Sequence, residues 1–331
     1  MSTRTRPTRR ALGLALALGL PLAGCAQLPT VSTPPAPERV LPVVAPAQAA
    51  RITTDAVAGL QSADPVADPT AAAERLTGPE LDLRTAAARI AAAGGTPAAT
   101  GGADDFDPVS SLLPRQEDWP RWFVVVTGAG ADEKPSFALL TSESARTPYK
   151  VWATPSLLPG VSLPTTDAPS AGADVVAPDE DTNLVASPQQ VAERYVDVLL
   201  RDTESEFVEQ FAEDAFRSGV EEAVQRDTAS LQAQGGRFEQ TRELLPDSVR
   251  AVRTRDGGAI AFAAMRWSTT QSGPAGGRAG TLDAATAALA GREQARSVTV
   301  VRDEVVAFAI PAQGTVRVLA AQSGPVSAEA S

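Results

Sequence analysis

Cysteine and histidine side chains supply much of the nucleophilic and metal-binding chemistry of proteins, and this chain has one cysteine, Cys25, and no histidine. The absence of imidazole excludes Ser-His-Asp and Cys-His catalytic groups, and it excludes a metal ion or haem bound through histidine. A single cysteine excludes an intramolecular disulfide, a cysteine-rich zinc site and an iron–sulfur cluster. The composition therefore predicts no catalytic residue of these kinds, no metal site and no cofactor.

Two catalytic arrangements do without histidine: a Ser-Lys pair and a pair of carboxylates. The only lysines are Lys134 and Lys150, and the residues three positions before them are Ala131 and Thr147, so the Ser-x-x-Lys spacing is missing. A glycosidase with two carboxylates stays open, because carboxylates need only converge in space, but the sequence offers no preferred pair. We therefore expect a protein that is not an enzyme.

Acidic and glycine-rich segments of the chain are candidates for cation and phosphate sites. The oxygen-bearing side chains that Ca²⁺ accepts form two groups, which are Asp174, Asp179, Glu180, Asp181 with Asn183, and Asp104, Asp105 with Asp107. The first group lacks the glycine and the terminal glutamate of an EF-hand loop, and we interpret both as solvated. Gly128 and Gly130 follow a strand-like run, but another strand comes next, whereas a dinucleotide site needs a helix N-terminus. We expect a hairpin turn there.

The amino terminus has the three successive parts of an export signal. Basic residues come first, an apolar run covers residues 11–22, and small residues lead to Cys25. A helix needs about 20 apolar residues to span a bilayer, and this run is shorter. It therefore indicates a cleaved signal peptide over residues 1–24 rather than a permanent span.

The last residues of this segment resemble the bacterial lipobox, and they are Leu22, Ala23, Gly24 and Cys25. The resemblance implies that the Cys25 sulfur receives a diacylglyceryl group and that cleavage leaves Cys25 as the first residue. Two acyl chains anchor a protein stably where one chain is marginal. We expect a lipid-anchored protein on the extracytoplasmic face of the cell membrane; the alternative is a signal peptide that is cut elsewhere, with Cys25 as an ordinary small residue.

Charge restricts the partners. The chain has 29 basic and 40 acidic side chains and a formal net charge of -11. Nucleic acid is excluded as a partner because phosphate binding needs a basic face. An acidic protein is also not drawn to anionic headgroups, so the lipid anchor must make the membrane contact. An envelope protein is the remaining partner class, and the sequence does not predict the oligomeric state.

The distribution of proline and of hydrophobic runs divides the rest of the chain. Residues 25–50 are rich in proline, threonine and serine, which is typical of an extended tether. The further predicted parts are a first α+β module over 51–163, a linker over 164–186, a second α+β module over 187–321 and a tail over 322–331.

Each module is predicted to place helices before antiparallel strands. In the first module these are helices at 51–60, 71–76 and 79–93 and strands at 122–127, 137–141 and 149–153. In the second module Ser187, Pro188 and Gln190 predict a capping box. The helical pattern continues through 206–214 and 216–234, and strands follow at 237–244, 249–254, 259–269, 297–310 and 315–320. Asp256, Gly257 and Gly258 predict a hairpin.

This order of elements resembles the nuclear-transport-factor-2-like and cystatin-like cone folds, in which a curved antiparallel sheet wraps the helices. Local segments also resemble an uncharacterised family of actinobacterial lipoproteins, and they are LTGPELDLR at 76–84, WFVVVT at 122–127, PYKVWA at 148–153 and LLPG at 157–160. The resemblance implies an envelope location and this domain layout. It implies no activity.

Cone folds can leave an apolar pocket between sheet and helices. Four aromatic residues of the second module could line such a cavity, and they are Phe207, Phe211, Phe262 and Trp267. The alternative is that they fill the core. Arg266 alternates onto the face of Phe262, where a buried charge would need a partner, or it lies at the exposed end of the sheet.

The sequence thus predicts a membrane-anchored extracytoplasmic lipoprotein that acts as a non-enzymatic binding or scaffold component of the cell envelope. A second hypothesis is a carrier of a small apolar or lipid-like ligand in a cavity of the second module.

Overall fold

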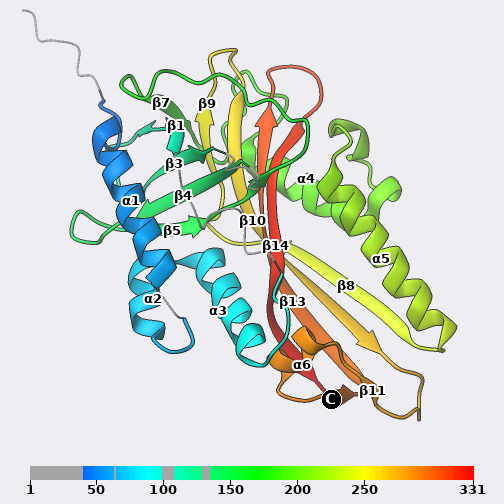
Figure 1. Ribbon diagram of the computed structural model, residues 1–331. Helices are drawn as coiled ribbons and strands as arrows, with labels where there is room; N and C mark the ends of the chain where they lie inside the picture. Colours follow the sequence, from blue (N-terminus) through cyan, green and yellow to red (C-terminus); the bar gives the residue numbers. More distant parts are fainter. Residues whose placement is uncertain (1–39, 63–64, 99–107, 129–134) are drawn as a thin grey trace, which may run out of the picture. The chain divides into compact units, whose positions relative to one another are not determined.

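A curved sheet of 12 strands connects the two halves of the chain (Figure 1). The computed structural model describes residues 40–331 apart from 63–64, 99–107 and 129–134. The predicted signal peptide, the lipobox, Cys25, and Asp104, Asp105 and Asp107 therefore lie outside the described residues. Along the sheet the order is β1-β3-β4-β6-β14-β13-β10-β9-β7-β2, with β5 paired to β4 and β8 paired to β10.

The strands of the first half are β1 (Pro108–Leu112), β2 (Pro114–Arg115), β3 (Arg121–Thr127), β4 (Ser136–Ser142), β5 (Lys150–Ala153), β6 (Ser156–Leu157) and β7 (Ala173–Val176). Those of the second half are β8 (Arg237–Leu244), β9 (Arg250–Arg253), β10 (Ala259–Ser272), β13 (Ser297–Ile310) and β14 (Arg317–Ala330), and β11 (Gly280–Thr281) pairs with β12 (Gln294–Ala295) in a separate ribbon.

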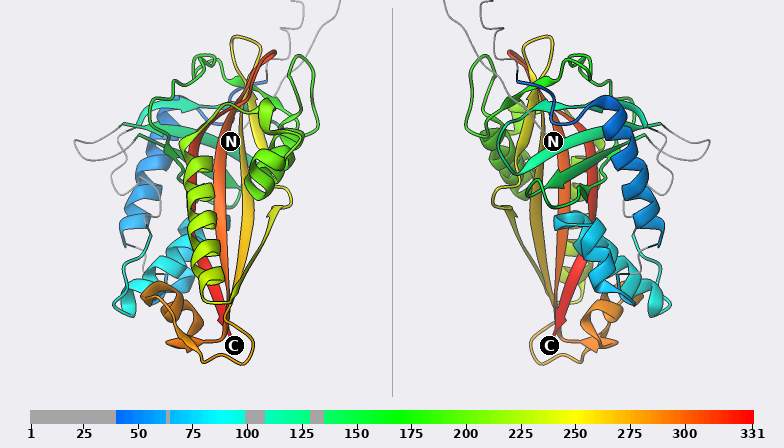
Figure 2. Two further views of the ribbon diagram at one scale, coloured as in Figure 1. Left: turned by 90° about the vertical axis from the view of Figure 1, so that its right-hand side faces the viewer. Right: turned by 90° about the vertical axis from the view of Figure 1, so that its left-hand side faces the viewer.

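The helices lie on both sides of the long strands. They are α1 (Pro46–Ser62), α2 (Pro69–Arg75), α3 (Gly78–Ala92), α4 (Pro188–Arg201), α5 (Ala215–Ala233) and α6 (Ala284–Ala290), with short 3₁₀ turns at Asp202–Glu204 and Val208–Gln210. Figure 2 shows α5 on one side of the long strands and α1, α2 and α3 on the other.

The predicted capping box is confirmed. The Ser187 hydroxyl accepts a hydrogen bond from the Gln190 backbone amide, the Gln190 side chain accepts one from the Ser187 amide, and Pro188 occupies the first turn of α4. Asp68 and Asp214 cap α2 and α5 in the same way, through the amides of Ala71 and Arg217. Local side-chain chemistry therefore determines where these helices begin.

The three longest strands, β10, β13 and β14, pair side by side in antiparallel register. The predicted hairpin before β10 is confirmed, because the Thr254 amide donates to the Gly258 carbonyl at 2.9 Å and Gly257 has a φ of 86°. A positive φ of this kind favours glycine. The N-terminal half of β10, residues 259–265, and the C-terminal half of β13, residues 303–310, are buried at every position. Both faces of the sheet are therefore covered there.

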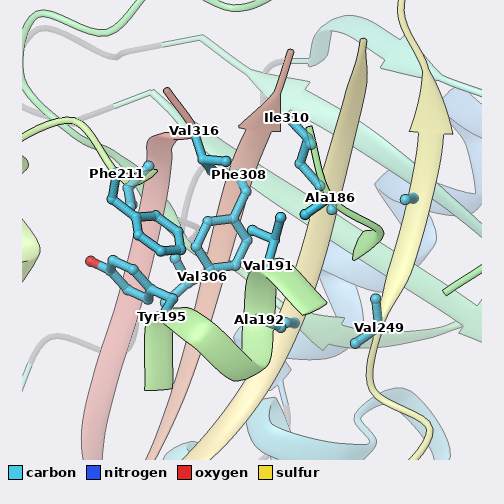
Figure 3. Packing of buried hydrophobic residues seen from close by; sticks show 14 of the residues in the cluster. Ala186, Val191, Ala192, Tyr195, Phe211, Val249, Val306, Phe308, Ile310 and Val316 are labelled. Carbon is cyan, nitrogen blue, oxygen red and sulfur yellow. The ribbon is translucent and has the colours of Figure 1, made fainter. Parts of the chain in front are cut away.

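Alternate residues of these strands enter two different cores. Under α4, Tyr195, Phe211 and Phe308 pack with Val191 and Ile310, as Figure 3 shows. On the opposite face, Phe262 packs with Phe137 and with residues of β3, β5 and β14. Strands of the first half of the chain therefore pack against the face of β10 and β13 that points away from α4.

The structure does not show two separately folded modules, and residues 40–331 form one compact unit. Strand β6 pairs with both β4 and β14, which joins the two halves in one sheet. The nuclear-transport-factor-2-like cone is not confirmed. What the described residues show is a mixed α+β fold with one large curved sheet.

The predicted linker over 164–186 contains a strand. Val175 of β7 pairs with Val252, and the Ala173 amide donates to the Leu113 carbonyl at 2.9 Å. Only four residues form β7, and a strand this short has too little alternation to be distinguished from a loop in sequence.

The predicted tail over 322–331 is wrong, because β14 pairs with β13 as far as Ala330. Gly324 and Pro325 suggest a chain break, but Gly324 allows α3 to approach closely. A Cβ there would lie 2.8 Å from a Leu83 methyl carbon. Pro325 follows it at an irregularity in the strand register, where a missing amide donor is tolerated.

Two further boundaries differ from prediction. The last residues of the predicted tether are packed, since Val43, Val44 and Ala49 are buried and α1 begins at Pro46. The predicted helix over 206–214 contains a single short 3₁₀ turn, Val208–Gln210, and a backbone bridge between Phe211 and Val316 follows it. Phe207 and Phe211 have helical spacing, but the bridge to Val316 holds the backbone of Phe211 in an extended conformation.

Candidate binding site

The structure does not bring the four candidate cavity residues together. Phe262 meets Phe137 edge to face at 5.1 Å on one side of the sheet, whereas Phe211 lies 5.1 Å from Tyr195 on the other side. Phe207 packs at the margin of the Tyr195 core, with the Arg194 guanidinium 5.5 Å from its ring. Phe211 and Phe262 therefore fill separate cores, and Trp267 lies farther along β10.

Trp267 lies among charged residues that form a row across the sheet. The row stands where the continuously buried parts of β10 and β13 end. We call this group the ionic belt, and its members are Arg242, Arg266, Trp267, Arg302, Asp303 and Glu304. On the α4 face, Arg242 Nη1 lies 2.7 Å from Glu304 Oε2, and both side chains are 0% exposed. On the opposite face, Arg266 donates to both Asp303 oxygens at 2.8 and 3.0 Å. Arg266 thus has the partner that burial would require.

The indole of Trp267 stands between two arginines of the neighbouring strands. The guanidinium carbons of Arg242 and Arg302 lie 4.7 and 5.1 Å from its ring, and its Nε1 donates to Gln240 at 2.9 Å. Burial raises the pKa of Glu304, although Arg242 opposes this effect, and burial lowers the pKa of Arg242. Each charge is costly alone and is offset by the other, so this belt is a structural element.

A second polar contact ties α4 to α5. The Tyr195 hydroxyl donates to the Asp214 carboxylate, whose oxygens lie 3.1 and 3.0 Å away, and Asp214 also caps α5. Burial raises the pKa of Asp214 and raises that of Tyr195. The contact fixes the start of α5 over the Tyr195 core.

The LTGPELDLR segment at 76–84 has a structural role. Glu80 is 0% exposed, and its carboxylate accepts from Arg84 at 2.7 Å, from Thr154 at 3.0 Å and from Gln322 at 2.9 Å. Gly78 has a φ of 57°, and a Cβ there would lie 2.7 Å from the Trp152 indole nitrogen. This segment therefore clamps α3 to β14 and to the strands of the first half.

An open pocket of about 420 Å³ lies between α1, the end of α2, the approach to β3 and the β4–β5 connection. We call it the aromatic–arginine pocket. Trp119 and Tyr149 provide aromatic rings, Arg75 and Arg121 provide positive charge, and Asp55 is an acidic residue of the lining. Val43, Val44 and Ile52 form an apolar part. An apolar pocket with a few converging polar groups is typical of a small-molecule site.

Arg121 is held in this lining by contacts on two sides. Its guanidinium carbon lies 4.7 Å from the Trp119 ring, and its Nη2 donates to the Glu117 carbonyl at 2.6 Å. Tyr149 meets Phe123 edge to face at 5.1 Å. Burial raises the pKa of Tyr149, and the positive charge of Arg121 opposes that rise. The hydroxyl and the guanidinium therefore influence each other.

The far rim of the pocket is a turn that is fixed by its own hydrogen bonds. The Ser144 amide donates to the Thr147 hydroxyl at 2.9 Å, and the Ser142 hydroxyl donates to the Thr147 carbonyl at 2.8 Å. The pocket wall is therefore formed before any ligand arrives, which reduces the entropy cost of binding.

The sequence did not predict the aromatic–arginine pocket. The aromatic residues of the first half gather at Trp119, Trp122, Tyr149 and Trp152, and this concentration was the available signal. It could not show which rings are buried. Trp122 and Trp152 are in the core, whereas Trp119 is 38% exposed.

Two residues of the acidic group in the predicted linker pair with arginines and are not simply solvated. Asp174 pairs with Arg115, and Glu180 pairs with Arg253. Within residues 40–331, outside the three gaps, no group of three or more metal-ligating side chains converges. The described helices are also too short or too polar to cross a membrane.

The fold and the pocket define an α+β protein with one continuous sheet and a preformed lateral pocket. The chain belongs to the DUF8094 family, described as a domain of unknown function, whose model matches residues 40–330. A similar protein is an "Uncharacterized lipoprotein" of Streptomyces avermitilis, which is 24% identical over 257 residues that cover 76% of this chain and 73% of the relative. No solved structure matches the chain significantly.

Proposed function

We propose that the protein is a lipid-anchored extracytoplasmic lipoprotein that binds a small molecule in the aromatic–arginine pocket and is not an enzyme. The pocket carries this proposal, because rings, charges and a preformed rim converge on about 420 Å³ of open space. The lipobox at Cys25 and the lipoprotein name of the Streptomyces avermitilis relative support the anchor.

The first experiment tests ligand binding in the full chain, with Cys25→Ala to keep it unlipidated. Native mass spectrometry and thermal unfolding are recorded before and after delipidation. A bound molecule that is lost together with several degrees of thermal stability supports the proposal, provided that Trp119→Ala also loses it. Val109→Ala is the matched control, because Val109 is an exposed apolar residue, 62% exposed, outside the pocket lining. A chain without extra mass and without a thermal shift would contradict the proposal.

The anchor is tested separately in cells. We expect Cys25→Ala to leave the membrane fraction or to accumulate unprocessed, because no diacylglyceryl group can be attached. Metabolic lipid labelling and the mass of the mature chain measure this. Unchanged labelling and unchanged mass would contradict the lipid anchor.

A carrier of a small apolar ligand is the second candidate function. A pocket of about 140 Å³ lies between α4 and α5, and Val198, Val220 and Val224 contribute to its lining. It contains none of the four aromatic residues that the sequence suggested. A bound lipid whose mass persists in Trp119→Ala but disappears in Val220→Trp would favour the carrier.

A further inference from the structure

We infer that the aromatic–arginine pocket takes an organic anion, in which a carboxylate or phosphate group is attached to an apolar ring system. This inference rests on the proposed binding function and specifies its ligand. It depends on the charge balance of Arg121 and Arg75 and on the nature of the surrounding wall.

Arg121 lacks a negative partner. Within the part of the chain that the structure describes, no carboxylate lies within ion-pair distance of its guanidinium, and its buried Nε has no acceptor. Its one hydrogen bond goes to the Glu117 carbonyl, which carries no net charge. A guanidinium that is partly removed from water in this way favours an anion that restores the lost interactions.

The comparable arginine stack on Trp267 has a carboxylate partner that Arg121 lacks among the described residues. Arg242 lies at the same 4.7 Å from its indole as Arg121 does from Trp119, but Arg242 also binds Glu304. Among the described residues Arg121 has no such carboxylate, and it lines the open pocket. Arg75, at the end of α2, adds a second positive charge to the lining and has no ion pair within the described residues.

The rest of the wall determines the body of the ligand. Val43, Val44 and Ile52 are apolar, and Trp119 and Tyr149 present rings. Such a wall accepts a flat apolar group next to the charged head. Asp55 is also in the lining, so a second negative group on the ligand would be repelled there.

The test uses 1-naphthoate, 1-naphthyl phosphate and the neutral 1-naphthalenemethanol as probes, with the full-length Cys25→Ala chain and isothermal titration calorimetry. We expect the two anions to bind at least about tenfold more tightly than the alcohol, as charge-assisted hydrogen bonds require. Whichever of the two anions binds more tightly identifies the head group. Arg121→Gln should remove this preference, and Arg75→Gln should reduce it.

The matched control is Arg146→Gln, because Arg146 is exposed near the pocket rim but does not line it. It makes the same change in net charge and should leave all three affinities unchanged. Far-ultraviolet circular dichroism and thermal unfolding check that each variant folds. If Arg121→Gln does not fold, Arg75→Gln tests the preference for anions in its place.

Two other outcomes separate the inference from the binding proposal. If the alcohol binds as tightly as the anions and Trp119→Ala abolishes binding, the anion inference is overturned and the binding function stands. If none of the three probes binds, the anion inference is overturned, and the native mass spectrum and thermal shift of the first experiment decide the binding function. If Trp119→Ala binds the probes unchanged, both fail.

Discussion

Two of the arginine–tryptophan stacks in the described residues, Arg242 on Trp267 and Arg121 on Trp119, are alike in distance and opposite in setting. In the ionic belt, Arg242 covers Trp267 at 4.7 Å and pairs with the fully buried Glu304. In the aromatic–arginine pocket, Arg121 covers Trp119 at the same distance, beside open space and with no carboxylate of the described residues within ion-pair distance. The local contact therefore does not distinguish a structural site from a binding site. The two stacks differ in whether a carboxylate pairs with the arginine, and the predictions below test the ionic belt, the Glu80 clamp and the pocket.

The largest expected effect comes from removing half of the buried ion pair. Glu304→Leu leaves Arg242 charged and buried without its partner, so we expect a loss of about 4 kcal/mol in the free energy of unfolding. Urea denaturation measures it. In the double variant Arg242→Met/Glu304→Leu no unpaired charge remains, so most of the loss should be recovered. A double variant as unstable as the single one would show that the belt does not act as a pair.

Glu80 should give the next largest effect. Glu80→Ala leaves the donors of Arg84, Thr154 and Gln322 without the carboxylate that now accepts from them. A buried unsatisfied donor costs about 1–3 kcal/mol, so we expect a loss of about 3 kcal/mol by urea denaturation.

Glu74→Ala is the control for Glu80, because Glu74 is exposed on α2 and should change stability by less than about 0.5 kcal/mol. Hydrogen exchange adds a second readout. In Glu80→Ala the amides of α3 should lose protection before those of α4, because the clamp holds α3 alone. Equal loss in both helices would contradict a local clamp.

These positions also show which features of the fold could be predicted from the sequence. The capping box at Ser187 and the hairpin at Gly257 depend on neighbouring residues, and both were predictable. The role of Glu80 depends on Gln322, which is 242 positions away, and no local pattern contains that pairing. The joining of two expected modules into one sheet depends on the two residues of β6 and the four residues of β7, and both strands are too short to show a period.

The pocket was hidden from the sequence for the same reason. Trp119 and Arg121 are close in the chain, but Ile52, Arg75 and Tyr149 come to them from α1, from the end of α2 and from the β4–β5 connection. The aromatic residues were visible as a group, whereas their exposure follows from tertiary packing. The four candidate cavity residues of the second half were visible in the same way, and packing placed Phe211 and Phe262 in opposite cores.

Trp119→Ala should separate stability from binding. The ring is 38% exposed, so its removal should cost less than about 1 kcal/mol in unfolding free energy, whereas naphthoate binding should be lost. The matched core variant Trp122→Ala, at 4% exposure, should instead cost about 3–5 kcal/mol. Thermal unfolding and calorimetry on the same samples measure both quantities. Unchanged naphthoate binding in Trp119→Ala would remove the pocket as the site.

The smallest expected effect concerns the exposed end of the ionic belt. Asp82 of α3 lies near Asp303 and 4.0 Å from Arg266. Burial and the negative charge of Asp303 raise the pKa of Asp82, although Arg266 opposes this rise. An acid whose pKa is higher in the folded than in the unfolded state binds its proton first when folded. Its contribution to stability therefore improves as the pH falls through the folded pKa, and it levels off below the unfolded pKa.

Asp82→Asn mimics the protonated form at every pH. At pH 7 it should stabilise the protein by less than about 1 kcal/mol, because the Asp82 side chain is 50% exposed and solvent screens its charge. The difference in unfolding free energy between Asp82→Asn and the unmodified chain should close as the pH falls through the raised pKa of Asp82 toward its ordinary value. Urea denaturation at several pH values measures this. A variant that is less stable at pH 7 would mean that attraction to Arg266 outweighs repulsion from Asp303, and the belt would then be balanced on both faces of the sheet.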